Sequence, residues 1–227
     1  MSLIVIVPTR GRPANVERLI GAFDETCSLP DTQLVLCFDD DDQARWLARS
    51  VPRVLWINVG PRQRLGAWLN QAVAELLLNK PEVAGVGFMG DDHVPRTPGW
   101  DAAIAAALAE LGTGIAYGND LFQGENMPTA AFMTADIPKT LGYMCPPTLD
   151  HMFIDDVWLR WGRNLGQIRY LPDVVIEHLH PFLGKADWDA SYRESESLTK
   201  GDMASFDAYA GISPLQRDLE KLKGLLK

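Results

Sequence analysis

Short apolar runs alternate with amphipathic stretches in the first half of the chain. Four runs, mostly rich in β-branched residues, have the length expected of buried parallel strands. They span 3–8, 33–38, 54–59 and 83–89. Between and after them, apolar residues recur at helical spacing, which predicts helices over 15–23, 64–77 and 100–111. Alternating strands and helices predict right-handed βαβ units and an open α/β sheet.

The second half of the chain is less regular. Apolar patterns predict strands and one helix, followed by one or two further strands. The strands cover 113–118 and 130–135, the helix 155–166, and the last strand region 168–180. From Pro181 to about Ser205 no periodicity is clear, so we expect a loop or lid there. A final helix is predicted to begin with Ser213 as N-cap and Pro214 at the first helical position.

The composition describes a globular protein. The 227 residues are 47% hydrophobic and 22% charged, which predicts a sizeable core. The net charge of −9 counts against duplex DNA as the main ligand, although a local basic groove stays possible. Neither a signal peptide nor a transmembrane span is recognisable at the N-terminus. We therefore expect a soluble cytoplasmic protein without a membrane partner.

The three cysteines, Cys27, Cys37 and Cys145, are far apart and form no C-x-x-C pair. This spacing argues against a cysteine zinc site and against a disulfide framework, and it suits a reducing compartment. Cys37 lies within an apolar run and is predicted to be a small core residue.

Polar segments follow the four predicted strands of the first half. In an open α/β sheet, ligands bind beyond the carboxyl ends of the strands. The segments are PTRGRP (8–13), DDDD (39–42), GPRQRLG (60–66) and GDDH (90–93). Basic residues and carboxylates therefore converge on one edge, which suits a phosphorylated ligand with a bridging cation. No phosphate loop with a lysine and no G-x-G-x-x-G pattern is present there.

Two histidine-containing pairs are candidates for a metal site. Asp91 and His93 are two residues apart, so in extended backbone their side chains point the same way. Mixed oxygen and nitrogen ligation suits Mn²⁺ better than Ca²⁺. His178 and His180 repeat this spacing. Alternatively, the D-D-H triplet is a solvated turn and the later histidines belong to a core strand; the spacing alone leaves both interpretations open.

An ordered set of motifs resembles the GT-A glycosyltransferases, especially family 2-like enzymes. The set consists of LIVIVPTRGRP, acidic residues after the second strand, RLGAWLNQA, GFMGDDH, AAFMTADIPKTLGYMCPP and HMFIDDVWLRWGRNLGQIRYLPDVVIEHLHP. The resemblance covers about 3–181. It implies an α/β GT-A (nucleotide-diphospho-sugar transferase) fold, with a Rossmann-like central mixed sheet flanked by helices.

The same resemblance implies a division of the chain. Residues 1–181 would form the catalytic domain, in which 1–93 is the nucleotide-binding half and 94–181 the acceptor half. Residues 182–227 would form a C-terminal lid or loop and a helix extension.

The D-D-H triplet stands where the GT-A family has its D-x-D motif. The resemblance places Asp91 near the donor ribose or metal, and Asp92 and His93 against the metal and diphosphate, without ranking them. His178 would be a further metal ligand and His180 the second choice. The implied cation is Mn²⁺ or Mg²⁺.

The resemblance also implies a donor pocket. Pro8, Thr9 and Arg10 would line it, and Asp39 or Asp40 would accept a hydrogen bond from a uracil N–H. Arg64 would approach the base or phosphates; alternatively it is a surface arginine at a helix start. Asp41 and Asp42 are expected to lie in a solvated turn.

Two carboxylates are candidates for the general base. A divalent cation neutralises the departing diphosphate, and the acceptor hydroxyl must lose a proton as it attacks. Asp155 and Asp156 lie at the start of the predicted helix, where the helix dipole stabilises anions. Asp155 is expected to cap the helix. By analogy with family 2, Asp156 would be the base and the reaction would invert. The family often has Glu-Asp here, so the choice between the two stays open.

Four tryptophans are candidate sugar platforms. Trp158 and Trp161, three residues apart on the predicted helix, are expected in the core, and Trp100 is the third candidate. Trp188 lies in the irregular stretch and is predicted to belong to a lid over the donor.

The sequence therefore predicts a metal-dependent glycosyltransferase that moves a sugar from a nucleotide-sugar, specifically a UDP-sugar, to an acceptor hydroxyl. A sugar-phosphate nucleotidyltransferase is one alternative, but those enzymes usually carry a Gly-rich signature with a lysine, which PTRGRP lacks. A non-catalytic sugar-nucleotide or partner-binding module is the other; intact Asp92, His93 and Asp156 argue against it. The donor sugar and the acceptor, whether small molecule, glycan, protein or modified nucleobase, are left open, and nucleic acid is not favoured.

Overall fold

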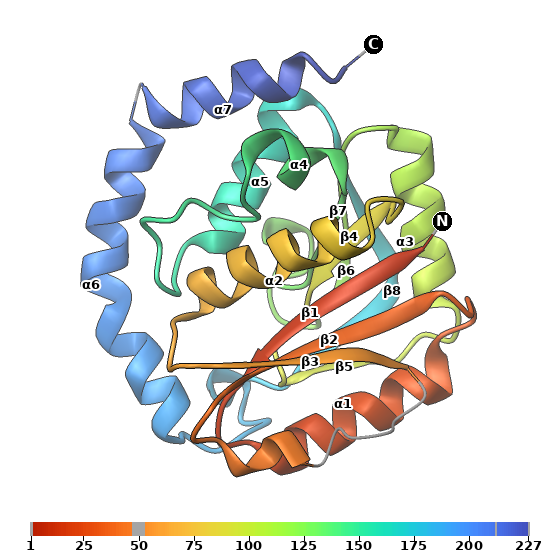
Figure 1. Ribbon diagram of the computed structural model, residues 1–227, viewed down its shortest axis with the longest axis vertical. Helices are drawn as coiled ribbons and strands as arrows, with labels where there is room; N and C mark the ends of the chain where they lie inside the picture. The colour runs from red at the N-terminus through yellow and green to blue at the C-terminus, as the bar shows by residue number, and fades with distance from the viewer. Residues whose placement is uncertain (1, 47–52, 212, 227) are drawn as a thin grey trace.

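The computed structural model describes residues 2–46, 53–211 and 213–226, and Figure 1 shows their arrangement. Strands in these residues form one eight-stranded sheet in the order β3-β2-β1-β4-β7-β6-β8-β5. Its first half is parallel and contains β1 (Leu3–Thr9), β2 (Thr32–Asp39), β3 (Val54–Gly60) and β4 (Gly85–Phe88). The four predicted strands are thus confirmed as parallel neighbours.

The second half makes the sheet mixed. Its strands are β5 (His93–Pro95), β6 (Ile115–Asn119), β7 (Ala131–Thr134) and β8 (Ile168–His178). β7 runs antiparallel to β4 and β6, and β8 is parallel to β6. The short β5 pairs antiparallel with β8. The region 168–180 therefore contains one long strand, whose end meets the segment that carries the D-D-H triplet.

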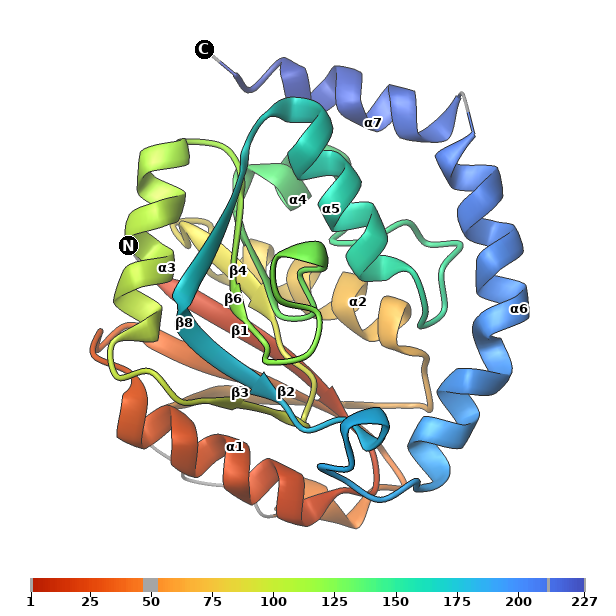
Figure 2. The same ribbon diagram turned by 180° about the vertical axis from the view of Figure 1, so that it is seen from behind.

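Helices cover both faces of the sheet. On one face lie α1 (Pro13–Thr26) and α3 (Trp100–Leu111); on the other lie α2 (Leu65–Asn79), α4 (Asp136–Leu141) and α5 (Ile154–Leu165). β1 shows why there are two cores. Its side chains alternate, so Ile4 and Ile6 join the core under α2, while Leu3, Val5 and Val7 join the core under α1. Figure 2 shows the sheet from behind.

Two C-terminal helices pack along the side of the domain (Figures 1 and 2). They are α6 (Ala190–Ala210) and α7 (Pro214–Lys223). Phe206 and Tyr209 of α6, together with Leu219 and Leu222 of α7, belong to the same buried cluster as the helices over the sheet. These residues of α6 and α7 are therefore packed into the main core.

The predicted loop between Pro181 and about Ser205 is wrong for most of its length. A short 3-10 helix (Pro181–Leu183) is followed by α6 from Ala190 onward. The helical pattern is hidden because the first half of α6 has no apolar stripe; Tyr192 is its only buried side chain among the described residues before Asp202. Ion pairs and hydrogen bonds, described below, hold this half in place instead.

The burial of individual side chains tests several smaller predictions. Cys37, Trp158 and Trp161 are fully buried, as predicted. Trp100 is also fully buried and therefore cannot serve as a sugar platform. Ser213 does occupy the N-cap position of α7, with Pro214 in the first turn, but its side chain makes no capping hydrogen bond. None of the helices in the described residues is both long and apolar enough to cross a membrane.

Candidate functional site

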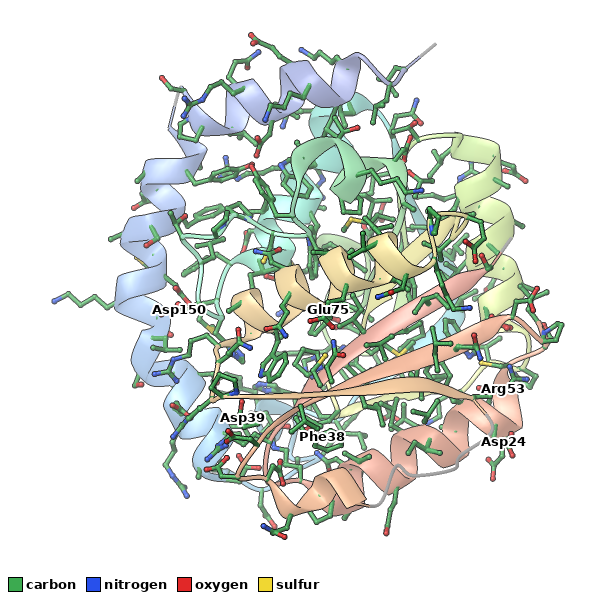
Figure 3. All side chains as sticks on the ribbon, viewed as in Figure 1. Asp24, Phe38, Asp39, Arg53, Glu75 and Asp150 are labelled. Carbon is green, nitrogen blue, oxygen red and sulfur yellow. The ribbon has the colours of Figure 1, made fainter. Side chains whose placement is uncertain are left out.

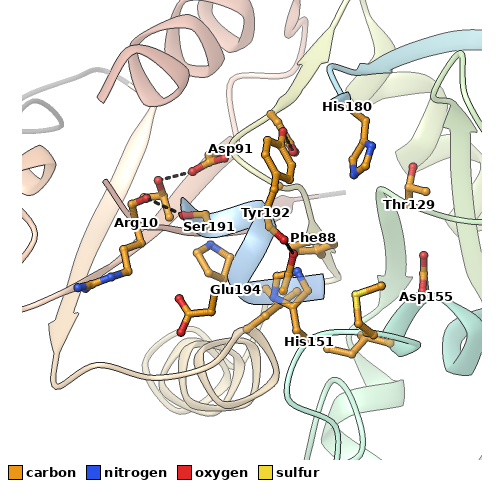
Figure 4. A pocket seen from close by; sticks show the side chains of 18 of the residues that line it. Arg10, Phe88, Asp91, Thr129, His151, Asp155, His180, Ser191, Tyr192 and Glu194 are labelled. Atoms are coloured by element: carbon orange, nitrogen blue, oxygen red, sulfur yellow. Dashed lines mark hydrogen bonds between the residues drawn. The ribbon is translucent and has the colours of Figure 1, made fainter. Parts of the chain in front are cut away.

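A cavity of about 450 Å³ opens where the strands of the parallel half end. This volume lies within the range typical of small-molecule sites. Of the predicted site residues, most line it: Pro8, Thr9, Arg10, Asp39, Arg64, Asp91, Asp92, His93, Asp155, His178, His180 and Trp188. Asp40 and Asp156 are not among the lining residues. The fold therefore brings together groups from segments that are far apart in the sequence, some of which Figure 4 labels.

The pairing of β5 with β8 brings two histidines together. His93, at the start of β5, is directly opposite His178, at the end of β8. Their rings stack with centroids 4.3 Å apart. Asp92 lies beside both: its Oδ1 is 3.4 Å from His93 Nδ1, and its Oδ2 is 3.4 Å from His178 Nε2. One possible ligand atom from each residue lies within 4.8 Å of the others.

The charges in this group are tightly linked. Burial alone would raise the pKa of Asp92, but His178 and His93 together hold it well below its usual value. Burial would lower the pKa of His178, yet the attraction of Asp92 outweighs burial and raises it. Burial and the neighbouring His178 both lower the pKa of His93. The Asp92 carboxylate therefore stays ionised and favours a positive charge beside it, which a bound metal cation would supply.

The three side chains fit a divalent transition-metal ion. They offer one oxygen and two nitrogens, a set that suits Mn²⁺ better than Ca²⁺. His178 Nδ1 is buried and has no hydrogen-bond partner among the described residues. The triplet also needs the glycine before it, because a Cβ on Gly90 would come within 2.5 Å of Asp92 Oδ1 and 3.0 Å of His93 Nδ1.

His180, the second-choice ligand, lies outside this group. Its ring stacks on Phe122 and Phe182, with centroids 5.5 Å and 5.0 Å away. Its Nδ1 accepts a hydrogen bond from the backbone N–H of Phe182. His180 therefore forms part of an aromatic surface rather than part of the three-residue cluster.

Asp91 faces away from the histidines and binds Arg12. Its carboxylate accepts hydrogen bonds from the Thr9 hydroxyl at 2.5 Å and from Arg12 at 3.0 Å. Burial raises the pKa of Asp91, while Arg12 opposes that effect. Sequence reasoning missed Arg12, although it stands in the PTRGRP segment. Its guanidinium also lies 4.0 Å from the centre of the Tyr192 ring and pairs with Asp189.

Asp39 lies at the carboxyl end of β2, where strand ends and their side chains gather (Figure 3). It accepts hydrogen bonds from the Gln63 backbone, the Trp68 indole and Arg10, at 3.1, 3.1 and 2.6 Å. Asp39 is 2% exposed, whereas Asp40 is exposed and outside the cavity lining. Between the two candidates, the geometry therefore favours Asp39 as the residue that faces the ligand.

The remaining acidic residues of the run differ from each other. Asp41 is exposed, as expected, and pairs with Arg10. The expectation that Asp42 is solvated is wrong: it is 7% exposed and accepts backbone N–H groups of Gly11 and Ala44. It thereby fixes the PTRGRP segment next to the second strand end.

The first turns of α6 close one side of the cavity (Figure 4). The Tyr192 hydroxyl donates a hydrogen bond to Asp92 Oδ2 at 2.7 Å. Glu194 forms ion pairs with Arg62 at 2.6 Å and with Arg64. Sequence reasoning missed Tyr192, Glu194 and Arg62, because the contacts arise only when a helix from the end of the chain reaches the strand ends. The paired Arg64 is thus a cavity residue rather than a free surface arginine.

The two aspartates at the start of α5 differ in whether they line the cavity. Phe153, with φ of 66°, takes the N-cap position, so the expectation that Asp155 caps the helix is wrong. Asp155 lies in the first turn and lines the cavity; Asp156 does not. Burial, followed by repulsion from Asp156, raises the pKa of Asp155 to about 6. His151, which the sequence did not single out, lines the same wall and has its pKa lowered by burial.

The chain resembles solved glycosyltransferases in structure. A mannosyltransferase, PcManGT from Pyrobaculum calidifontis in complex with GDP-Man and Mn²⁺, superposes with a TM-score of 0.60 at 15% identity, over 98% of this chain and 79% of that one. TarS 1-349 from S. aureus, in complex with UDP-GlcNAc, gives 0.58 at 15% identity, over 100% and 72%. A longer TarS chain gives 0.59 at 15% identity, with 43% of its length covered.

No known protein-family model matches the chain, and no curated protein sequence matches it either. The structural likeness nevertheless confirms the predicted fold. The chain has the mixed α/β sheet, flanked by helices, of the GT-A glycosyltransferases.

Proposed function

We propose that this protein is a metal-dependent glycosyltransferase that moves a sugar from a nucleotide-sugar to an acceptor hydroxyl. The observation that carries the proposal is the Asp92–His93–His178 cluster, which lies in the same cavity as Arg10, Arg12, Arg62 and Arg64. Four cations beside a candidate divalent-metal site suit a ligand that bears a diphosphate. The structural neighbours that bind UDP, UDP-GlcNAc and GDP-Man support the same ligand class.

The donor half of the cavity would bind the nucleotide. A bound Mn²⁺ or Mg²⁺ would neutralise charge that develops on the diphosphate as the sugar leaves. Asp92, His93 and His178 would hold that cation, while Arg12 pairs with Asp91 next to them. The Asp39 carboxylate has four lone-pair positions and accepts hydrogen bonds from three donors. One position is therefore left to accept a hydrogen bond from an N–H group of the nucleobase. This favours a uridine nucleotide.

Asp155 would be the general base. It lines the cavity, and a base works best when its pKa lies near the operating pH, as the value of about 6 does. Asp156 is not among the lining residues, so we assign the role to its neighbour Asp155. With a carboxylate that deprotonates the acceptor, a direct displacement and inversion at the anomeric carbon are the outcome we propose.

Both alternative functions fit the cavity less well. A sugar-phosphate nucleotidyltransferase usually has a lysine in a Gly-rich loop after the first strand, whereas the described cavity lining contains arginines and no lysine. A non-catalytic binding module would bind a nucleotide-sugar but release no free nucleotide. Turnover therefore separates the second alternative from a transferase.

Nucleotide-sugar binding that depends on Mn²⁺ is the expected result of a thermal-shift panel. UDP-sugars and GDP-mannose would be tested with Mn²⁺ and with EDTA, and release of free nucleotide would be measured in parallel. A ligand present at about 100 times its Kd stabilises the folded state by about 2.7 kcal/mol, enough to raise Tm by several degrees. A panel in which no compound gives a shift that requires Mn²⁺ would count decisively against the proposal.

Replacing Glu194 by glutamine is expected to tighten donor binding. The Glu194 carboxylate forms ion pairs with Arg62 and Arg64, and in the proposed complex these arginines would instead face the donor phosphates. Partly exposed ion pairs are worth about 0.3–1 kcal/mol, so the Kd for the donor should fall roughly 2- to 5-fold, as measured by titration calorimetry. The matched control is Asp207→Asn, which removes an exposed carboxylate farther along α6. An unchanged Kd in Glu194→Gln would show that glutamate and donor do not compete.

A further inference from the structure

The arginine side chains that line the cavity all belong to its donor half. The cationic side chains among the described lining residues are Arg10, Arg12, Arg62 and Arg64. They come from the segments after β1 and β3, and each is paired with a carboxylate. No lysine or arginine from residue 94 onward is among the lining residues that the structure describes. A second anionic ligand in the other half would therefore meet no lysine or arginine side chain among the described lining residues.

Four aromatic side chains, here called the aromatic wall, form the surface of that other half. They are Phe122, His180, Phe182 and Trp188. Successive rings lie in contact: Phe122 stacks on His180 at 5.5 Å, His180 on Phe182 at 5.0 Å, and Phe182 meets Trp188 edge to face at 5.0 Å. They come from three separate segments, so the wall is produced by the fold and not by a local run of aromatic residues.

Part of the aromatic wall is left open to solvent. Phe182 is 66% exposed and Trp188 is 38% exposed. The flanking Leu121 and Leu183 are also exposed. A single exposed apolar side chain needs no explanation, but a contiguous patch that borders a cavity is typical of a binding surface.

The loop that carries Phe122 is held rigidly. One oxygen of Asp120 accepts the backbone N–H groups of Phe122, Gln123 and Gly124, and the other accepts the Thr129 hydroxyl. These bonds lower the pKa of Asp120, although burial opposes them. The carboxylate therefore stays ionised and fixes the loop before any ligand arrives. This is the preorganisation expected of a binding wall rather than of a flexible surface loop.

We propose that the aromatic wall is the acceptor subsite, and that the acceptor is a neutral, ring-bearing alcohol. This inference rests on the proposed glycosyltransferase function. The ring of the acceptor would lie against Phe182 and Trp188, and its hydroxyl would point to Asp155, which lines the same cavity on the side away from Arg10 (Figure 4). Phosphorylated or polyanionic acceptors are disfavoured for three reasons. This half has no lysine or arginine among its described lining residues, the Asp155 carboxylate is nearby, and the net charge of the protein is −9.

The reaction balances without a further reactant. The acceptor oxygen forms a bond to the anomeric carbon of the donor sugar, and the bond from that carbon to the phosphate oxygen breaks. Its electron pair leaves with the nucleoside diphosphate. The hydroxyl proton passes to the Asp155 carboxylate and then to water.

An acceptor panel tests this inference. The enzyme would receive Mn²⁺ and whichever of UDP-glucose, UDP-GlcNAc or GDP-mannose it hydrolyses fastest. Methyl glucoside presents a neutral sugar ring, 2-naphthol a neutral aromatic ring, and glucose 6-phosphate an anionic ring. Products would be identified by mass spectrometry. We expect transfer to a neutral compound to exceed transfer to glucose 6-phosphate, and the better of the two neutral compounds identifies the kind of ring.

The variant Phe182→Ala connects this preference to the aromatic wall. We expect the acceptor KM to rise roughly 10-fold, because the acceptor ring loses apolar contact area. Leu78→Ala, which truncates an exposed apolar residue outside the cavity, should leave both the acceptor KM and donor hydrolysis unchanged. A preference for glucose 6-phosphate, no reaction with either neutral ring, or an unchanged acceptor KM in Phe182→Ala would overturn the inference. Failure of donor hydrolysis in the wild type would instead overturn the proposed function itself.

Discussion

Replacing Asp92 by asparagine is expected to abolish the stabilisation of the folded protein by Mn²⁺ and to lower the rate of sugar transfer by roughly 10²–10⁴-fold. A loss of this size corresponds to several kcal/mol of charge stabilisation that the metal ion no longer provides. Asp92 is the one carboxylate of the proposed metal cluster and lies between its two histidines. Asparagine keeps the shape of the side chain but removes the charge that holds the cation. The measurements are Tm with and without Mn²⁺, and release of nucleotide.

The matched variant for this experiment is Tyr192→Phe. It removes the hydroxyl that donates to Asp92 Oδ2 but leaves all three proposed ligands in place. We expect it to keep a Mn²⁺-dependent rise in Tm. Circular dichroism would confirm that Asp92→Asn is folded, since His178 then loses its charged partner in a largely buried position. Retention of full activity in a folded Asp92→Asn enzyme would remove Asp92 from the metal site.

Replacing Asp155 by asparagine is expected to lower transfer by roughly 10²–10⁴-fold, the usual contribution of a general base, while the Kd for the donor stays unchanged. Asn cannot accept the acceptor proton, and the donor would bind on the opposite half of the cavity. The control is Asp156→Asn on the same helix, outside the cavity lining. It should lower activity no more than a few-fold. The reverse ranking of the two variants would return the role of base to Asp156.

The pH profile gives an independent readout of the same residue. Only the ionised form of Asp155 can act as a base, so kcat/KM should rise between pH 5 and pH 7 with a midpoint near its pKa of about 6. Asp155→Asn should lose this rise. The folded protein binds the Asp155 proton more tightly than the unfolded chain does, so this group stabilises the fold at low pH and loses that effect as pH rises through about 6. Asp155→Asn should therefore unfold at a higher temperature at pH 7.

Local pattern was enough to predict most of the fold. The strands 3–8, 33–38 and 83–89 lie inside the sheet and are almost entirely buried, so each appears as a continuous apolar run that needs no partner to be recognised. The strand 54–59 lies at the sheet edge, where Val59 is exposed, but its apolar run is recognised in the same way. The first half of α6 was missed for the opposite reason. Its polar surface is held by Arg12, Arg62 and Arg64, which lie more than a hundred residues away, and no periodicity within the segment shows this.

Strand order explains which parts of the site could be predicted. Parallel strands end at one edge, so the convergence of Thr9, Asp39 and Asp91 follows from the βαβ pattern. The sequence could not rank His178 against His180 from their spacing. The antiparallel register of β5 and β8 does so, because it puts His93 opposite His178 and leaves His180 beyond the end of the strand.

The sequence by itself therefore determined the α/β fold, the donor edge and the residue types that could hold a metal, because these depend on short-range periodicity and on the chemistry of neighbouring side chains. The tertiary structure decided which members of two pairs line the cavity, Asp39 rather than Asp40 and Asp155 rather than Asp156, and it placed His178 rather than His180 beside Asp92 and His93. It also added Arg12, Tyr192 and the aromatic wall. The physical reason is that adjacent residues have nearly the same local pattern, while register, helix phase and the return of a distant helix determine which side chain points inward.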